Sequence, residues 1–273
     1  MRLVLARLVV WSDQLTSGPL SGHAPCVLEP VQRQNLSDAV FVQLRDRILD
    51  GTFEPGSALP GERDLASRLG TSRGAVREAL RRLSQIRLVA IHGGGSTRVR
   101  DFRRDAGLDL LADLLTSTDA ALLREAARSL IELRTALGPD IAARAAARGG
   151  PQVASDLEAV VARMELAPDD PLARDDLALE LWGLIVDASA NLAYRLAFNT
   201  MQHGWARVRA MVAPLLAAEQ GDVAGHRALV RAVGSGDVTR AKRAAERLLA
   251  KGEAAMLSGL AAADTGTRRR TKR

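Results

Sequence analysis

Apolar residues recur at helical spacing through most of this chain, and the character of the pattern changes near Arg103. Residues 36–102 combine short helical patterns with two apolar runs that flank a glycine-rich segment, which is typical of a β-hairpin. Residues 106–258 consist almost entirely of Ala, Leu, Val, Arg, Glu and Asp in helical period, interrupted by Gly-Pro, Gly-Gly and Pro-Asp-Asp-Pro, which we interpret as helix breaks. The pattern predicts a mainly α protein whose second part is an all-α bundle of about six or seven helices.

The two ends of the chain show no sustained period. We expect residues 1–34 to form a disordered leader, or to reflect a start codon assigned too far upstream. A signal peptide is not expected, because Arg7 interrupts the initial apolar run and no small-residue cleavage site follows. No stretch approaches the ~20 apolar residues that a membrane helix needs. Together with the single cysteine, these features predict a cytoplasmic protein. Its expected segments are a leader 1–34, a first domain 35–103, a bundle 106–258 and a basic tail 259–273.

Three helices are expected ahead of the hairpin, the third starting after Thr71 or Ser72. A helix-turn-helix needs a small residue where its helices cross, a glycine in the sharp turn and an apolar residue early in the second helix. Ala66, Gly70 and Val76 stand at these intervals. The sequence therefore predicts a helix-turn-helix followed directly by a hairpin, an arrangement known as a winged helix.

The third helix carries arginines at i, i+4 and i+8, namely Arg73, Arg77 and Arg81, on a face away from its apolar stripe. The first residues of a recognition helix contact base edges, where a guanidinium binds guanine O6 and N7 through two hydrogen bonds. A solvated basic face, partly neutralised by Glu78, is the structural alternative. His92, at the base of the hairpin, is placed to reach the neighbouring minor groove or the backbone.

The overall charge also favours a nucleic-acid partner. The chain has 38 Lys+Arg against 32 Asp+Glu, a formal net charge of +6, and only three of the basic residues are lysines. Arginine suits phosphates and guanine edges, although an arginine bias is also a habit of some genomes. Aromatic residues make up 3%, which argues against stacking on single-stranded bases. No Gly-Lys-Ser/Thr follows the glycine run, so a nucleotide-binding loop is not expected.

The first domain resembles the winged helix of the GntR transcription regulators. The resemblance is carried by Leu44-Arg45-Asp46, Gly51, Pro55-Gly56, Leu59-Pro60, Glu62-Arg63-Asp64-Leu65-Ala66, Leu69-Gly70, Ser72-Arg73, Val76-Arg77-Glu78-Ala79-Leu80 and Leu83. It implies that the residues contacting operator DNA are Arg63, Ser72, Arg73, Arg77, His92 and Gly93. One departure is Gln85-Ile86-Arg87, where the family usually has a glycine before the strand; we expect it to alter the angle of the wing and not the readout.

The second domain resembles the ligand-binding domain of FadR-like members at Leu130–Leu137, Ile141–Ala146, Asp187–Asn191 and His226–Val233. Its length is too short for the pyridoxal-phosphate enzyme domain of some relatives. Its helical pattern is unlike the mixed sheet domain of the sugar-responsive relatives.

Many FadR-like relatives hold a metal ion with an Asp-x-x-x-His pair and two later histidines. The positions that correspond in this chain are Ala178, Trp182, His226 and Leu248. Since one ligand of four cannot hold a divalent ion, we expect no metal and no other cofactor.

Bulky apolar residues replace the metal ligands, and they favour a largely hydrophobic effector. The residues in question are Leu181, Trp182, Leu184, Phe198, Met201 and Trp205, for which plain core packing is the alternative. The metal-free pattern most resembles the fatty-acid-responsive branch, whose effectors are free fatty acids or long-chain acyl-CoA. The expected effector-binding residues are Arg134, Trp182, Asn191, Asn199 and His226.

The sequence thus predicts a homodimeric DNA-binding transcription regulator, a repressor that a fatty acid or long-chain acyl-CoA releases from a palindromic operator. An enzyme is not expected, because no nucleophile–base motif, phosphate loop or metal set is present. Two alternatives stay open: the same regulator sensing a small organic acid, and a DNA-binding protein that responds to no ligand.

Overall fold

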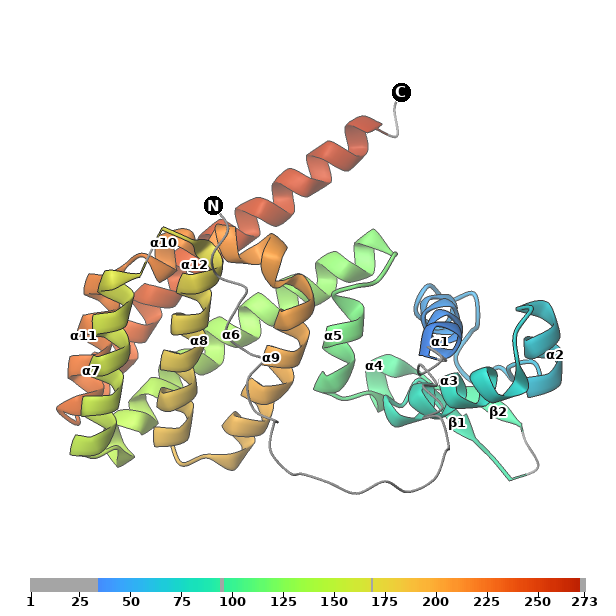
Figure 1. The fold of residues 1–273 in the computed structure, drawn as a ribbon, viewed down its shortest axis with the longest axis horizontal. Helices are drawn as coiled ribbons and strands as arrows, with labels where there is room; N and C mark the ends of the chain where they lie inside the picture. The colour runs from blue at the N-terminus through green and yellow to red at the C-terminus, as the bar shows by residue number, and fades with distance from the viewer. Residues whose placement is uncertain (1–33, 94–95, 168, 271–273) are drawn as a thin grey trace, which may run out of the picture. The chain divides into compact units, whose positions relative to one another are not determined.

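The computed structural model describes residues 34–93, 96–167 and 169–270 (Figure 1). The chain divides into two units, Met1–Gln34 and Asn35–Arg273. The expected leader falls almost entirely outside the described residues, as do the tip of the glycine-rich hairpin and the last three residues of the basic tail. The second unit contains both expected domains. Within its described helices, none is long and apolar enough to cross a membrane.

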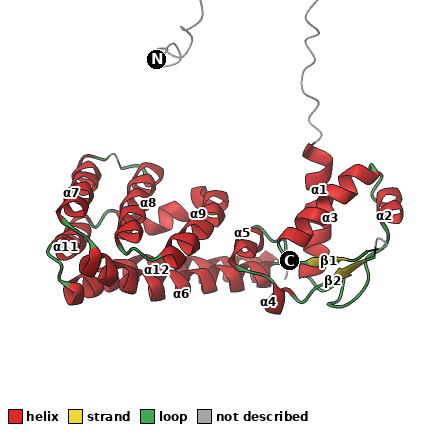
Figure 2. Cartoon of the chain, turned by 90° about the horizontal axis from the view of Figure 1, so that it is seen from below, coloured by secondary structure: helices red, strands yellow, loops and turns green. Residues whose placement is uncertain are grey.

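The first domain begins with three helices: α1 (Gln34–Leu49), α2 (Glu62–Arg68) and α3 (Arg73–Gln85). Two short antiparallel strands follow, β1 (Val89–Ile91) and β2 (Thr97–Val99), with Val89 opposite Val99 and Ile91 opposite Thr97 (Figure 2). The segment before α2 lies along the other edge of β2, where the Leu59 amide donates to the Thr97 carbonyl at 2.8 Å. The predicted winged helix-turn-helix is confirmed.

The turn between α2 and α3 has the geometry that the residue spacing predicts. Ala66 is buried where the helices cross, and Val76 is fully buried on α3. Gly70 has φ +60°, a left-handed conformation that glycine adopts without steric cost. Ser72 caps α3, because its side chain accepts a hydrogen bond from the Ala75 amide at 3.2 Å.

Short helices connect the two domains: α4 (Phe102–Asp105), the 3₁₀ turn η1 (Leu108–Leu110) and α5 (Leu111–Leu114). The second domain is helical in its described residues. Its elements are α6 (Ala120–Arg148), α7 (Pro151–Leu166), α8 (Pro171–Ala188), α9 (Leu192–Val212), η2 (Ala213–Leu216), α10 (Ala217–Gln220), α11 (Val223–Gly234) and α12 (Val238–Arg270). Six of these are long helices, as the pattern predicts, and α6 and α12 pack side by side along the bundle (Figures 1 and 2).

The expected break at Gly138-Pro139 is wrong, because both residues lie inside α6. Proline removes one backbone donor, but the surrounding packing holds the helix together. A Cβ on Gly138 would lie 2.3 Å from Leu249 Cδ1 and 3.5 Å from Trp182 Cη2, so α12 and α8 both approach α6 closely here. The glycine is needed for this contact and does not end the helix. The Gly-Gly pair, by contrast, does separate α6 from α7.

Three apolar clusters stabilise the described fold, and the smallest is formed by α6, η2 and α12. The bundle core is built around fully buried side chains of α7, α8, α11 and α12, such as Leu157, Leu181, Leu229 and Leu248. The winged-helix core continues through α5 into the start of α6, and Val208 of α9 belongs to it. Helix α9 packs on η1 and α5 and so extends this core toward the second domain.

Candidate DNA-binding surface and effector pocket

All six residues expected to contact DNA are exposed on the first domain. Arg73 and Arg77 project from the first two turns of α3, which is the end of a recognition helix that contacts bases. Ser72 is exposed too, although its hydroxyl already caps the helix. His92 and Gly93 follow β1, where the His92 amide donates to the Ser96 carbonyl at 2.9 Å and closes the base of the wing. These placements agree with the expected surface without testing it.

Arg77 has a partner that the sequence analysis did not identify. Its guanidinium forms two hydrogen bonds to Glu62 of α2, with Nη2 2.8 Å from Oε2. The hydrogen bond from Arg77 lowers the pKa of Glu62, so the pair stays ionised at neutral pH. Glu78, expected to neutralise this basic face in part, pairs with Arg81, with Oε2 3.9 Å from Nη1. Because the Arg77–Glu62 pair is exposed, Arg77 can exchange Glu62 for a nucleic-acid acceptor.

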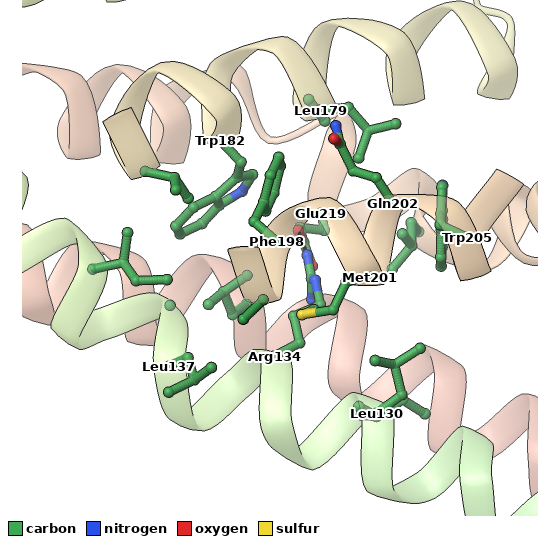
Figure 3. Close-up of a pocket in the computed structure, with 18 of the residues that line it drawn as sticks. Leu130, Arg134, Leu137, Leu179, Trp182, Phe198, Met201, Gln202, Trp205 and Glu219 are labelled. Atoms are coloured by element: carbon green, nitrogen blue, oxygen red, sulfur yellow. Dashed lines mark hydrogen bonds and ion pairs between the residues drawn. The ribbon is translucent and has the colours of Figure 1, made fainter. Parts of the chain in front are cut away.

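A pocket opens inside the second domain between α6, α8 and α9, with η2, α10 and α12 closing it (Figure 3). Its volume is about 130 Å³. Most of its lining is apolar, and Trp182, Phe198 and Met201 form much of the wall. The pocket therefore offers an apolar ligand a largely preformed site.

A buried ion pair lies in this apolar lining. Arg134 of α6 points toward Glu219 of α10 and binds it through Nη2 and Oε1 (Figure 3). The Glu219 side chain is 2% exposed, and this burial raises its pKa, while the Arg134 charge acts in the opposite direction. The ion pair with Arg134 therefore opposes the effect of burial only in part.

A second buried carboxylate lies on α8. Asp175 accepts hydrogen bonds from three side chains: Trp205 Nε1 at 2.9 Å, Arg209 Nε at 2.6 Å and Gln220 Nε2 at 2.8 Å. These bonds connect α8, α9 and α10 at one end of the pocket. Arg209 compensates the charge of Asp175, so this carboxylate is satisfied without a ligand.

The pocket brings together two of the five expected effector-binding residues, Arg134 and Trp182. Asn191 caps α9, with its side-chain oxygen accepting from the Ala193 and Tyr194 amides. Asn199 lies on α9 but outside the lining. His226 is fully buried in α11, also outside the lining, and its burial lowers its pKa. Sequence reasoning missed Glu219 and Asp175, since no local pattern marks either carboxylate as buried.

The metal site of the FadR-like resemblance does not fit the residues present. Ala178 and Trp182 line the pocket with apolar atoms, and Leu248 is buried in the core. His226 contributes the one nitrogen donor of the set, and its Nδ1 lies 2.9 Å from the Asp222 carbonyl. Across residues 34–93, 96–167 and 169–270, no group of three or more His, Cys, Asp or Glu could hold a metal ion.

A charged cluster around Asp113 of α5 connects α1 with α9. Asp113 of α5 is buried and pairs with Arg45 Nη1 at 3.1 Å and with Arg207 Nη1 at 2.9 Å. Arg45 belongs to α1 and is itself buried, whereas Arg207 belongs to α9. Helix α9, which lines the pocket, is thus connected through Asp113 to α1, the first helix of the winged domain.

Comparisons with known proteins identify both domains. Residues 36–99 match the family model of bacterial regulatory proteins of the gntR family, and residues 129–251 match the FCD domain. The chain is 39% identical to the HTH-type transcriptional regulator Mce2R of Mycobacterium tuberculosis over 81% of this chain and 92% of that protein.

The chain also has more distant matches. The Fatty acid metabolism regulator protein of Serratia proteamaculans is 32% identical over 60% of this chain and 66% of that protein. Among solved structures, a GntR protein of Streptococcus agalactiae aligns with 80% of this chain and 98% of its own at 23% identity and a TM-score of 0.42. The chain belongs to the GntR family of bacterial DNA-binding transcription regulators, which are not enzymes, and carries an FCD ligand-binding domain.

Proposed function

We propose that this regulator binds a palindromic operator as a homodimer, represses transcription there, and leaves the DNA when a fatty acid or long-chain acyl-CoA enters the FCD domain. The observation that carries the proposal is the apolar pocket lined by Trp182, Phe198 and Met201. The fatty acid metabolism regulators among the relatives lend it weaker support. Apolar ligands gain free energy in proportion to the area that they remove from water, about 25 cal/mol per Å².

On the DNA side, the proposal assigns base and phosphate contacts to Arg63, Ser72, Arg73 and Arg77, with His92 and Gly93 at the wing. Their exposure on one domain supports the assignment. Two-fold symmetry of the dimer places two recognition helices on two half-sites, so the operator is palindromic.

Helix α9 is the element that connects the two activities. It supplies Phe198, Met201 and Trp205 to the pocket. Its Arg207 pairs with Asp113 of α5, and Asp113 in turn pairs with Arg45 of α1. A ligand that fits one position of α9 better than another shifts the population of domain arrangements. Repression ends when the favoured arrangement no longer fits adjacent half-sites.

The alternative of a small organic acid as effector draws on Arg134, the cation of the pocket lining. Glu219 already neutralises that charge, which weakens this alternative. A regulator that responds to no ligand would show no shift in thermal melting with any acyl compound.

Replacement of Trp182 by alanine tests the acyl pocket. Because Trp182 is buried in the pocket wall, Trp182→Ala is expected to weaken the effect of acyl-CoA on operator binding at least tenfold while operator affinity without ligand stays unchanged. Leu166→Ala serves as the control, since Leu166 is 87% exposed on α7. If the response to acyl-CoA survives and only the melting temperature falls, Trp182 is a core residue and the pocket assignment is wrong.

A further inference from the structure

Helix α9 presents one continuous side to the pocket. Its lining residues Phe198, Met201, Gln202 and Trp205 are spaced at i, i+3, i+4 and i+7, so they share one face of the helix. Figure 3 shows the Gln202 amide pointing away from the Arg134–Glu219 pair, toward the side where Leu179 of α8 lies. Gln202 and Leu179 both line the pocket and are both half-buried, so the amide lies where the pocket reaches the surface between α8 and α9.

The amide of Gln202 is free to bind a ligand. Among residues 34–93, 96–167 and 169–270 it has no hydrogen-bond partner. It also differs from the unpartnered atoms of Arg134 and Glu219, because those atoms are enclosed by packed protein and the Gln202 amide is not. A ligand oxygen can therefore accept a hydrogen bond from this amide without breaking any contact inside the protein.

The other hydrogen-bonding side chains of the lining either contact a protein partner or keep their free atoms enclosed. They are Arg134, Asp175, Trp182, Tyr194, Trp205, Glu219 and Gln220. Tyr194, for example, donates to Asp140, and Trp205 donates to Asp175. Within the described part of the chain, Gln202 is thus the lining residue that offers an accessible and unpaired polar group.

The apolar part of the pocket begins directly beside this amide. Met201 is the preceding residue on α9, and Phe198 lies one turn back, where it packs on the same core as Trp182 of α8. An acyl chain along these side chains has its polar end within reach of Gln202. A carboxylate and a thioester carbonyl both carry an oxygen that accepts from an amide N–H, so Gln202 suits the free fatty acid and the acyl-CoA alike.

We propose that Gln202 is the residue that binds the polar end of the acyl ligand. Its Nε2–H donates to the carboxylate or thioester oxygen between α8 and α9, and the chain runs inward along Met201, Phe198 and Trp182. Arg134 and Glu219 then form part of the closed wall and do not meet the head group. The inference rests on the proposed function, because it assumes that an acyl chain fills the apolar part of the pocket.

Opposite charges placed at position 202 test this orientation. Gln202→Lys and Gln202→Glu act on a nearby carboxylate with opposite sign. Calorimetric titration with decanoate at neutral pH is expected to show at least fivefold tighter binding to the lysine variant and at least fivefold weaker binding to the glutamate variant. A poorly folded variant loses affinity, so it cannot imitate the gain expected for Gln202→Lys.

His203 provides the matched control. It is the next residue on α9, but it is exposed and lies outside the pocket lining. His203→Lys and His203→Glu change the charge of the same helix by the same amounts, away from the pocket. Both variants are expected to bind decanoate within twofold of the unaltered protein.

Two results would overturn the inference in distinguishable ways. If the two variants at position 202 change the affinity for decanoate in the same direction, or leave it unchanged, the polar end lies elsewhere while acyl sensing stands. If the unaltered protein binds neither decanoate nor longer acyl compounds, the proposed function fails and the inference fails with it.

Discussion

Arg87 adopts φ +60° at the position after α3 where the GntR resemblance leads us to expect glycine. The backbone there forms a helix stop of the Schellman type, in which the Leu88 amide donates to the Leu83 carbonyl at 2.9 Å and the Arg87 amide to the Ser84 carbonyl at 3.1 Å. Arg87 thus adopts the left-handed conformation that a glycine would adopt at this position. A side chain in this conformation costs roughly 1–2 kcal/mol.

Arg87→Gly is therefore expected to stabilise the winged helix. Relief of the left-handed strain outweighs the larger entropy of glycine in the unfolded chain, so the free energy of unfolding should rise by about 0.5–1 kcal/mol. Urea denaturation measures the change. Arg87→Ala controls for loss of the arginine side chain, because alanine keeps the Cβ and should give no such gain. A fall in stability for the glycine variant would contradict the reasoning.

Substitutions of Arg77 and Glu62 distinguish a role of Arg77 in DNA recognition from a role only in the ion pair with Glu62. Arg77→Ala removes a guanidinium from the base-contacting end of α3 and should weaken specific operator binding roughly tenfold or more. Glu62→Gln removes the pair but leaves Arg77 free, so its operator affinity should equal or exceed that of the unaltered protein. Electrophoretic mobility shifts with operator DNA and with scrambled DNA measure the affinities of both variants. Unchanged operator affinity for Arg77→Ala would refute its role in recognition.

Arg73 and Arg77 could be proposed from the sequence because helix periodicity places them on one exposed face, whereas Arg63, Ser72 and Gly93 were proposed from the GntR resemblance. In the pocket, the FadR-like resemblance pointed to Arg134, but its pairing with Glu219 could not be predicted. Arg134 and Glu219 are 85 residues apart and meet through tertiary packing. Local sequence presents Glu219 as an ordinary charged helix residue, and its burial depends on distant helices.

At the scale of elements, the sequence pattern identifies the helices but misjudges one of their interruptions. Glycine next to proline usually marks the end of a helix, yet α6 passes through Gly138-Pro139 because α12 approaches it there. Gly138 allows the close approach of Leu249, a side chain more than 100 residues away in the chain. Local sequence therefore cannot show whether this glycine ends the helix or makes room for a packed helix.

Two glycines of the bundle give opposite predictions for substitution by alanine. At Gly138 the new Cβ would overlap buried Leu249, so overpacking is expected to outweigh the gain in helix propensity and to lower the free energy of unfolding by about 1–2 kcal/mol. A Cβ on Gly183 of α8 would lie 3.9 Å from its nearest neighbouring atom. Gly183→Ala should therefore raise the free energy of unfolding by up to about 1 kcal/mol.

Urea denaturation of the two glycine variants side by side measures these changes. A rise in the free energy of unfolding for both variants would show that helix propensity, and not the close approach of α12, governs this part of α6.

At the scale of the whole chain, the pocket and the DNA-binding surface share α9. Asp113 is buried between Arg45 of α1 and Arg207 of α9, so a shift of α9 changes a contact made by the first helix of the winged domain. An ionic contact of this kind is costly to break while its partners stay buried, which favours movement of the connected elements as a unit. The sequence predicts both domains separately, but a contact that joins residues 45, 113 and 207 follows from the fold alone.

The central claim is that an acyl ligand in the FCD domain controls operator binding. Fluorescence anisotropy with DNA from the region upstream of the protein's own gene, with and without long-chain acyl-CoA, tests it most directly. The account predicts tight and sequence-specific binding that acyl-CoA abolishes. Tight binding that is indifferent to acyl-CoA and to fatty acids would contradict acyl control and would leave a GntR-family regulator with a different effector.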